Sequence, residues 1–438
     1  MLKNTNVIGL HSDDFSILPT AKSFHQQLLS NIANAKQRIY IVALYLQEDE
    51  AGQSVLQALF DAKKSNPSLD VKVIVDHHRA IRGLIGEKAH GGNREWYQKI
   101  AQGYETPIDV LGVAIKPKEL FGVLHLKGMV FDDEVLYSGA SINNVYLHVG
   151  ERYRLDRYFS LQSKSLADSI VNFINAAFIL NGTHTDLLAP ALPSKPEVTK
   201  LSKRTRRLVQ KNRYQAKESE RSSLAVTPLL GLGRRKNLLN QRIVQLIRSS
   251  QTNVCLYTPY FNLPRRLTKE VVNAMKRGVA ITIVVGDKRA NDFFIPEDKP
   301  FSFIGIVPYI YETILARFVK RYQSFIDKGL LDIRLWRHES NSFHLKGINV
   351  DHREYLLTGS NLNPRAWLLD IENGLLLEDK QGLLTQAFAQ EHEAICQHTT
   401  LLRHFEQLES IDDYPEQPRR LIKRVKMAKV DRLLKRLL

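Results

Sequence analysis

His125-Leu-Lys-Gly-Met-Val-Phe-Asp132 decides the fold of this chain, because it returns as His344-Leu-Lys-Gly-Ile-Asn-Val-Asp351. Both copies keep the histidine, the lysine, the glycine and the aspartate at the same spacing. The two histidines are 219 residues apart (344 − 125), and other paired segments repeat at nearly the same offset. An eight-residue pattern that recurs within such a frame indicates a duplicated chain.

The segments before each copy repeat as well. Residues 25–45 read as a helix and a buried strand, and so do residues 238–260. A second helix and strand follow each of them, and this alternation predicts βαβ units. We therefore expect an α/β protein built from two α/β/α units. The expected parts are repeat 1 at 1–190, a basic linker at 191–235, repeat 2 at 236–412 and a basic amphipathic tail at 413–438.

Composition limits the class of protein. The chain has 438 residues, and its 62 Lys and Arg against 46 Asp and Glu give a net charge of +16. A length of this order allows two or three domains with ample cores. The charge predicts an anionic partner: phosphate esters, nucleic acid or an acidic membrane surface.

Cysteine usage and hydropathy predict the compartment. Two cysteines, Cys255 and Cys396, are too few for a disulfide framework or a cysteine-rich metal site. The first 18 residues contain no apolar signal core, and no run approaches the roughly 18–20 apolar residues that span a bilayer. We expect a cytoplasmic protein that reaches membranes from the surface.

The repeated motif places two reactive side chains together. Residues two apart on a strand share a face, so His125 and Lys127 point the same way. Gly128 leaves room for an anion near the backbone. Asp132, at an odd spacing from His125, falls on the opposite face of a regular strand and either orients an imidazole or braces the strand. The second copy repeats every element with His344, Lys346, Gly347 and Asp351.

Each half continues into a polar turn that ends in an asparagine, Asn143 or Asn363. Lysine and amide groups suit the charge that develops on a phosphoryl centre. One imidazole can attack phosphorus while the other protonates the leaving oxygen. Lysine is a poor metal ligand at neutral pH and no further ligands cluster nearby, so we expect no metal and no cofactor.

These motifs resemble the phospholipase D superfamily, whose signature is His-X-Lys-X4-Asp followed by a Gly-Ser-X-X-Asn turn. Further stretches are similar to the CDP-diacylglycerol–serine O-phosphatidyltransferases of Gram-negative bacteria. The resemblance runs from about residue 20 to the C-terminus. The stretches are 42–45, 136–143, 156–158, 226–233, 258–264, 292–298 and 363–367.

The resemblance implies a reaction and a site. CDP-diacylglycerol binds with its pyrophosphate at one active site on the pseudo-twofold interface, and CMP leaves as a phosphatidyl-histidine forms. L-serine then takes the phosphatidyl group, and no metal takes part. By analogy His125 is the nucleophile and His344 the general acid and then base, although the near-symmetry of the motifs leaves this assignment open. The implied site contains His125, Lys127, Asp132, His344, Lys346 and Asp351 as catalytic residues and Asn143 and Asn363 as substrate-binding residues.

The two halves are not equivalent. Ala140 stands where the signature has serine, whereas the second turn keeps Ser360. The spacing between the aspartate and the turn also differs by one residue. This asymmetry is compatible with different roles for the two histidines.

Three regions are candidates for contact with lipid or RNA. Residues 419–438 carry nine Lys and Arg against Asp431 alone, with apolar residues at helical spacing, which is typical of a basic amphipathic helix on an anionic membrane. A helix packed on the protein is the alternative. Residues 293–311 are rich in aromatic residues and fit either an acyl-chain loop or a core segment. Residues 195–217 are basic, which fits either a solvated linker or a segment that contacts lipid headgroups or RNA.

Two other functions fit parts of the pattern. The paired motifs alone also suit a phosphodiesterase or nuclease, or a phosphatidyltransferase with another alcohol acceptor. A third hypothesis is not enzymatic: a nucleic-acid-binding or ribosome-associated protein whose active site is no longer used. A predicted strand is followed by His77, His78, Arg79 and Arg82, which suit cytidine contacts or a surface loop equally well.

We expect peripheral attachment of the protein to the inner membrane.

Overall fold

The computed structural model describes residues 6–82, 92–216 and 222–427, which form two compact units. Unit 1 comprises Met1–Leu239, Leu357–Gly359 and Leu369–Leu383, and unit 2 comprises Asn240–Leu356, Ser360–Leu368 and Leu384–Leu438. Two short pieces of the second sequence repeat thus pack with the first unit. The domain boundaries expected from the repeat stay a prediction.

An eight-stranded sheet forms the centre of unit 1, in the order β10-β5-β4-β3-β6-β7-β9-β2. The neighbours β3, β4 and β5 are parallel and the remaining pairs are antiparallel. The strands are β2 Phe15–Leu18, β3 Arg38–Val42, β4 Asp70–Asp76, β5 Asp109–Val113, β6 Gly128–Phe131, β7 Glu134–Ser138, β9 Tyr158–Gln162 and β10 Thr185–Asp186.

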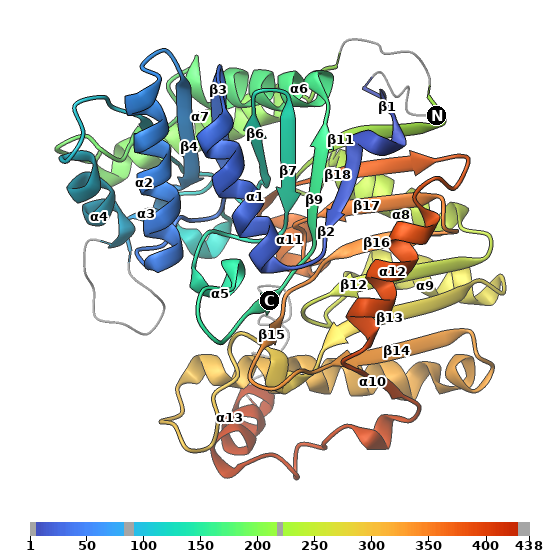
Figure 1. Cartoon of the computed structure of the whole chain (residues 1–438). Coiled ribbons are helices and arrows are strands. Elements are labelled where there is room, and N and C mark those ends of the chain that lie inside the picture. Colours follow the sequence, from blue (N-terminus) through green and yellow to red (C-terminus); the bar gives the residue numbers. More distant parts are fainter. Residues whose placement is uncertain (1–5, 83–91, 217–221, 428–438) are drawn as a thin grey trace. The chain divides into compact units, whose positions relative to one another are not determined.

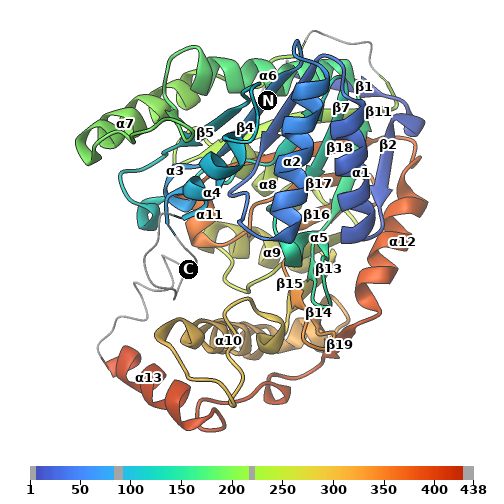
Figure 2. The ribbon, with the colours of Figure 1, turned by 60° about the vertical axis from the view of Figure 1, so that its left-hand side comes forward.

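Helices bury the apolar faces of this sheet. The helices α1, Ala21–Asn34, and α2, Glu50–Ser65, share one hydrophobic cluster with the strands (Figure 2). Each begins at a capping side chain, Thr20 or Asp49, that accepts a free backbone N–H of the first turn. The helix α6 packs against β6 and β7. The remaining helices are α3 His77–Ala80, α4 Gly92–Ala101, α5 Asn144–Leu147, α6 Lys164–Ile174 and α7 Lys195–Lys211, with the 3₁₀ helices η1 Ser12–Asp14 and η2 Glu119–Phe121 and the π-helix η3 Asn175–Ile179.

The stretch expected as a linker, 191–235, is largely structured. It contains α7, which starts with a Ser194–Glu197 capping box, and β11, Leu224–Leu232, which is buried along its whole length. In unit 1, β11 pairs antiparallel with β1, Ile8–Leu10, and with β18, Ile371–Asp379. β18 brings a segment of the second repeat into unit 1. The short strand β8 covers Arg154–Leu155.

Unit 2 contains a second α/β sheet. Its strands run in the order β17-β16-β12-β13-β14-β19, with β12, β13 and β14 parallel to one another. The helix α9 packs on β13, and α10 and α12 pack on β14. The strands are β12 Asn253–Thr258, β13 Ala280–Gly286, β14 Leu331–Trp336, β15 Ser342–Phe343, β16 Gly347–Val350, β17 Glu354–Thr358 and β19 Thr399–Leu402. The helices are α8 Leu238–Ser249, α9 Arg265–Lys276, α10 Val307–Asp327, α11 Pro364–Leu368, α12 Thr385–Cys396 and α13 Glu416–Met427, with η4 Lys288–Ala290, η5 Phe303–Ile306 and η6 Phe405–Gln407.

The helix expected in the tail forms at α13, but its apolar side packs on the protein. Ile422 is buried, and Leu421 and Val425 pack on the cluster that includes Tyr309 of α10 (Figure 1). This agrees with the alternative of a helix packed on the body, so the basic side of α13 is the one left for an anionic surface. Residues 428–438 of the predicted tail lie outside the described residues.

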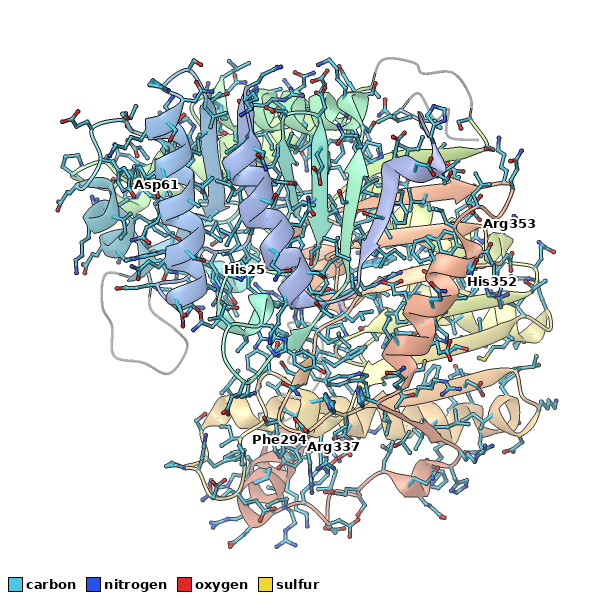
Figure 3. The ribbon with its side chains drawn as sticks, in the orientation of Figure 1. His25, Asp61, Phe294, Arg337, His352 and Arg353 are labelled. Atoms are coloured by element: carbon cyan, nitrogen blue, oxygen red, sulfur yellow. The ribbon has the colours of Figure 1, made fainter. Side chains whose placement is uncertain are left out.

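The aromatic segment at 293–311 is mainly a core segment. Val307, Tyr309 and Tyr311 are buried, and Phe294, labelled in Figure 3, packs partly buried on the same cluster. Phe303 is the exception, with 60% of its surface exposed. Within the described ranges, none of the helices has both the length and the apolar character to cross a bilayer.

Candidate active site

His125 lies in an extended segment that leads into β6, and not on the regular strand that the spacing suggested. Its backbone N–H donates to the carbonyl of Ile371 at 3.0 Å, and Leu124 forms an isolated parallel bridge to the same residue. The residue is 8% exposed. The start of β18 therefore fixes the backbone that carries the first histidine.

Glu372 orients the imidazole of His125. Both carboxylate oxygens lie within hydrogen-bond distance of Nδ1, at 2.9 and 3.0 Å, and Glu372 is 2% exposed. A buried carboxylate at this distance fixes an N–H on Nδ1 and directs the lone pair of Nε2 away from the carboxylate. This is the geometry that a nucleophilic imidazole requires.

Lys127 is held by the next residue of β18. The side chain of Asn373 accepts from the backbone N–H of Lys127 at 2.9 Å and donates to its carbonyl at 2.7 Å. Tyr137 and Thr358 in turn donate to the carbonyl of Asn373. Lys127 is 2% exposed, and its backbone has little freedom to move.

Backbone conformation explains why a glycine follows the lysine in each motif. Gly128 has a φ of +124° and Gly347 a φ of +150°, a region that side-chain-bearing residues rarely adopt. The backbone turns at these positions into β6 and β16. The sequence had suggested that Gly128 makes room for an anion, whereas its φ value alone accounts for glycine.

Asn143 caps a short helix and keeps its amide in contact with an aromatic residue. Its Oδ1 accepts from the backbone N–H of Tyr146 at 3.0 Å, and its Nδ2 donates to the hydroxyl of Tyr45 at 3.4 Å. The guanidinium of Arg79 lies over the ring of Tyr45, 5.1 Å from its centre. Arg79 and Arg82 also pair with Glu119.

His344, 7% exposed, has a different set of neighbours in unit 2. The Nζ of Lys346 lies within hydrogen-bond distance of Nδ1 of His344. The Oδ2 of Asp292 lies 3.8 Å from Nε2 of the same ring. Tyr260 donates its hydroxyl to that carboxylate oxygen at 2.6 Å and packs its ring edge-on against His344 at 5.7 Å.

Asn363 occupies the same kind of place as Asn143. Its Oδ1 accepts from the backbone N–H of Ala366 at 2.9 Å, and its side chain also bonds the side chain of Tyr311. The ring of Tyr311 stacks on Tyr260 at 5.1 Å with planes 7° apart. In each unit, therefore, the motif's asparagine bonds a tyrosine and caps a short helix.

Asp132 and Asp351 bond neighbouring backbone groups of their own units. The carboxylate of Asp132 accepts from the N–H groups of Lys36, Gln37 and Arg38 at 2.7 to 3.0 Å. Asp351 accepts from the N–H groups of Gln251, Thr252 and Asn253 in the same way. This placement is that of a strand brace, one of the two roles that the spacing had suggested.

We expect Asp132→Asn to lower the free energy of unfolding by about 1–3 kcal/mol, because an amide NH₂ replaces one accepting oxygen. Urea unfolding measures this. Asp133→Asn, at a neighbouring surface carboxylate that pairs with Arg38, is the control and is expected to cost about 1 kcal/mol or less. Equal losses in both variants would contradict the bracing role.

The lowered pKa values of the same two carboxylates lead us to expect that stability depends on pH. Burial raises the pKa of Asp132, but the three backbone hydrogen bonds outweigh it and lower the pKa below the usual 3.8; Asp351 behaves alike. A lowered folded-state pKa contributes stability above the unfolded value, which is lost as pH falls through the folded value. Acidification below about pH 4 is therefore expected to destabilise the wild type more than Asp132→Asn.

The residues after β4 belong largely to the core. His77 is 2% exposed, and burial lowers its pKa to about 4, with His78 adding to the shift. His78 bonds the carbonyl of Lys116 through Nε2. Burial raises the pKa of Asp76 to about 6. Its carboxylate accepts from the N–H of Leu124 and so links this turn to the segment that carries His125. Within the described parts of the chain, His, Cys, Asp and Glu side chains form no cluster that would hold a metal ion.

Comparison with known proteins identifies the family. The family model described as "Cardiolipin synthase, PLD-like domain" matches residues 28–172 and 243–398, one segment in each repeat. The CDP-diacylglycerol–serine O-phosphatidyltransferase of Haemophilus influenzae is 44% identical, over 100% of this chain and 97% of the relative. The Escherichia coli enzyme of the same name is 43% identical, over 97% of this chain and 95% of the relative. The chain belongs to this family of phosphatidyltransferases.

A solved structure also matches over the whole length. The crystal structure of phosphatidylserine synthase from Haemophilus influenzae matches with a TM-score of 0.95 and 44% identity. The match covers 100% of this chain and 98% of the crystallised chain. The expected fold, a duplicated phospholipase D-like α/β architecture, is thereby confirmed.

Sequence reasoning missed the residues around the histidines. Glu372 lies 247 residues from His125, whose ring it bonds, and Asn373 lies 246 residues from Lys127, whose backbone it bonds; nothing local in the motif indicates either contact. A usable signal was present, because an acidic residue follows the asparagine turn in each half, Asp156 or Glu372. Asp292 and Tyr260 fall in stretches that carried the family resemblance, without an expected role.

Proposed function

We propose that this protein transfers the phosphatidyl group from CDP-diacylglycerol to L-serine and releases CMP. The observation that carries the proposal is the 44% identity over the full chain to a curated enzyme of that name. The buried His–Lys pair in each unit supports it, since such pairs suit phosphoryl transfer without a metal.

In the first step, Nε2 of His125 attacks the phosphorus that bears diacylglycerol. A P–N bond forms, and the P–O bond to CMP breaks with its electron pair going to CMP. The ammonium groups of Lys127 and Lys346 stabilise the charge on the phosphoryl oxygens. Glu372 stabilises the positive charge that the attack leaves on the His125 ring.

In the second step, the hydroxyl oxygen of serine attacks the same phosphorus. The P–N bond to His125 breaks, the new P–O bond gives phosphatidylserine, and the serine proton passes to Nε2 of His344. His344 protonates the leaving oxygen in the first step and accepts a proton in the second. Asn143 and Asn363 contribute amide donors, and Asp132 and Asp351 act through the backbone segments that they hold.

We expect Glu372→Gln to lower kcat about 100-fold, because the amide still accepts from Nδ1 but no longer balances the positive ring. Glu372→Asp is expected to recover part of the loss. Initial rates of CMP release measure both variants. Glu378→Gln, a substitution on the same strand, is the control, and a rate for Glu372→Gln equal to that control would rule out the proposed role.

Release of CMP from CDP-diacylglycerol in mixed micelles, with and without L-serine, tests the function. Serine-dependent release with equal phosphatidylserine formation is expected. Release to phosphatidic acid alone would instead indicate a phosphodiesterase, and transfer to another alcohol would indicate a related phosphatidyltransferase. The same chemistry acting on nucleic acid would appear as a nuclease.

We propose that the protein works at the surface of the inner membrane, because its lipid substrate resides there. The net charge of +16 and the basic residues of α13 support attraction to anionic headgroups. Sedimentation with phosphatidylglycerol vesicles, lost at high salt, is the expected result, and no sedimentation at low salt would contradict it. Non-specific association with ribosomes or RNA stays a prediction, tested in the same salt series.

A further inference from the structure

A short apolar tip stands on the surface of unit 1, just before His125 in the chain. It is the 3₁₀ helix η2, Glu119–Phe121, in which Leu120 is 54% exposed and Phe121 is 49% exposed. Contact of two large apolar side chains with water is unfavourable, and exposed apolar patches mark surfaces that contact membranes, ligands or other proteins. The tip is therefore a candidate interaction surface.

The chain on either side holds this tip in place. The carboxylate of Glu119 pairs with Arg82 at 2.5 Å and with Arg79 at 3.4 Å. Gly122 follows with a φ of +140°, and a side chain at this position would collide with a backbone carbonyl oxygen 2.4 Å away. The apolar pair is thus presented to the outside by a turn of fixed geometry.

The surroundings of the tip are basic. Lys116 and Lys118 precede it, and Lys118 is exposed. Burial and the nearby positive charge of Arg206, on α7, lower the pKa of Lys116. The basic face of α7 therefore adjoins the tip, and Figure 2 shows this helix on the outside of unit 1. The exposed cations of α7 are Lys195, Lys200, Lys203, Arg204, Arg207 and Lys211.

The tip is also close to the proposed nucleophile. Phe121 and His125 are four residues apart, which allows at most about 14 Å between their Cα atoms. The chain between them is anchored, because the N–H of Val123 donates to the carboxylate of Asp370 at 2.9 Å. A surface that receives the tip is thereby brought close to His125 within the same unit.

An anionic membrane is the partner that fits both the apolar pair and its basic surroundings. Large apolar side chains suit the hydrocarbon boundary of a bilayer, and lysine and arginine suit anionic headgroups. The proposed donor substrate is a lipid whose acyl chains belong in the bilayer. Its phosphorus meets His125 only where the membrane lies close to that residue, which the position of the tip provides.

We propose that η2 is a membrane-insertion tip, in which Leu120 and Phe121 enter the interface of an anionic phospholipid bilayer while Lys116, Lys118 and the basic face of α7 bind its headgroups. The inference rests on the proposed transferase function and assigns the membrane-facing surface of unit 1. Two apolar side chains alone bind a bilayer weakly, so attachment still requires the cations and is still lost at high salt.

Tryptophan substitution tests whether the tip enters the bilayer. The test variant is Phe121→Trp, and the control is Leu383→Trp. Leu383 is 46% exposed in the same unit and follows β18, whose nine residues extend about 30 Å away from the segment of His125. With phosphatidylglycerol vesicles that carry brominated acyl chains, we expect the added emission of Phe121→Trp to fall by about half or more and that of Leu383→Trp to change by less than about a tenth.

Vesicle binding measures the contribution of each part of the surface. Leu120→Ser combined with Phe121→Ser is expected to weaken binding to phosphatidylglycerol vesicles about 10- to 30-fold, because both hydrocarbon contacts are lost. Lys116→Gln combined with Lys118→Gln is expected to weaken it about 10-fold at low salt. Sedimentation across a series of vesicle concentrations gives these ratios, and thermal melts check that each variant is folded.

Matched controls and a second measurement separate the outcomes. Leu383→Ser and Lys380→Gln, at the far end of β18, are expected to bind vesicles like the wild type. An unquenched Phe121→Trp protein, or wild-type vesicle binding by the double serine variant, would overturn the proposal. If ultracentrifugation shows that the serine variant loses a dimer but keeps its vesicle binding, the tip contacts a second copy of the chain instead. Normal vesicle binding without serine-dependent CMP release would refute the proposed function, which is a separate result.

Discussion

His125→Ala is expected to lose CMP release and phosphatidylserine formation together, by about 10⁴-fold or more, because no other group takes over the attack on phosphorus. The loss includes the exchange of labelled CMP into CDP-diacylglycerol, which requires only the first step. Initial-rate and exchange assays in the same micelles measure both effects. The alanine removes a buried side chain, so a fluorescence or thermal melt of the variant checks its fold.

His25→Ala is the matched control for this substitution. His25 lies on α1, where Figure 3 labels it, and its ring contacts Ser54 at 3.3 Å. It belongs to the same unit as His125 and takes no part in the proposed chemistry. Wild-type rates in His25→Ala are expected, and appreciable CMP exchange in a folded His125→Ala would contradict the role of His125 as nucleophile.

His344→Ala is expected to reduce turnover by about 10³- to 10⁴-fold while keeping a single burst of CMP. CMP leaves as a phosphate monoester, whose second pKa near 6 makes it a good leaving group with little need of a general acid. The serine hydroxyl is a far weaker acid and does need a base. Quenched-flow measurement of CMP is expected to give about one equivalent per active site, followed by a very slow rate.

His352→Asn is the control in the second unit. His352 is exposed in the turn between β16 and β17, with a φ of +54° that asparagine tolerates well (Figure 3). It is expected to turn over like the wild type. A His344→Ala protein that lacks the burst but remains folded would show that His344 is needed before the P–N bond forms.

Much of the fold followed from the sequence because its signals are local or repeated. The period of the duplicated motif, the helix-strand alternation and the buried strands such as Val71–Val75 in β4 all depend on neighbours in the chain. The tail shows the limit of this reasoning. Helical spacing predicted the amphipathic character of α13, but which surface covers Ile422 is a property of tertiary packing.

The sequence indicates the candidate reactive residues of the site but not the partners that surround them. His125, Lys127, His344 and Lys346 are marked by the repeat itself. Glu372 reaches His125 because β18 returns to unit 1, and Asp292 reaches His344 through a loop, so neither contact follows a sequence period. Asp132 was compatible with two roles by spacing alone, and its backbone hydrogen bonds favour bracing.

Locating the covalent intermediate tests the central assignment most directly. His344→Ala is mixed with CDP-diacylglycerol, denatured without exposure to acid, digested and analysed by mass spectrometry. The account predicts a phosphatidyl group on the peptide that contains His125, in an amount that matches the CMP burst. A phosphatidyl group on His344 in the corresponding experiment with His125→Ala, and none on His125 in His344→Ala, would contradict it.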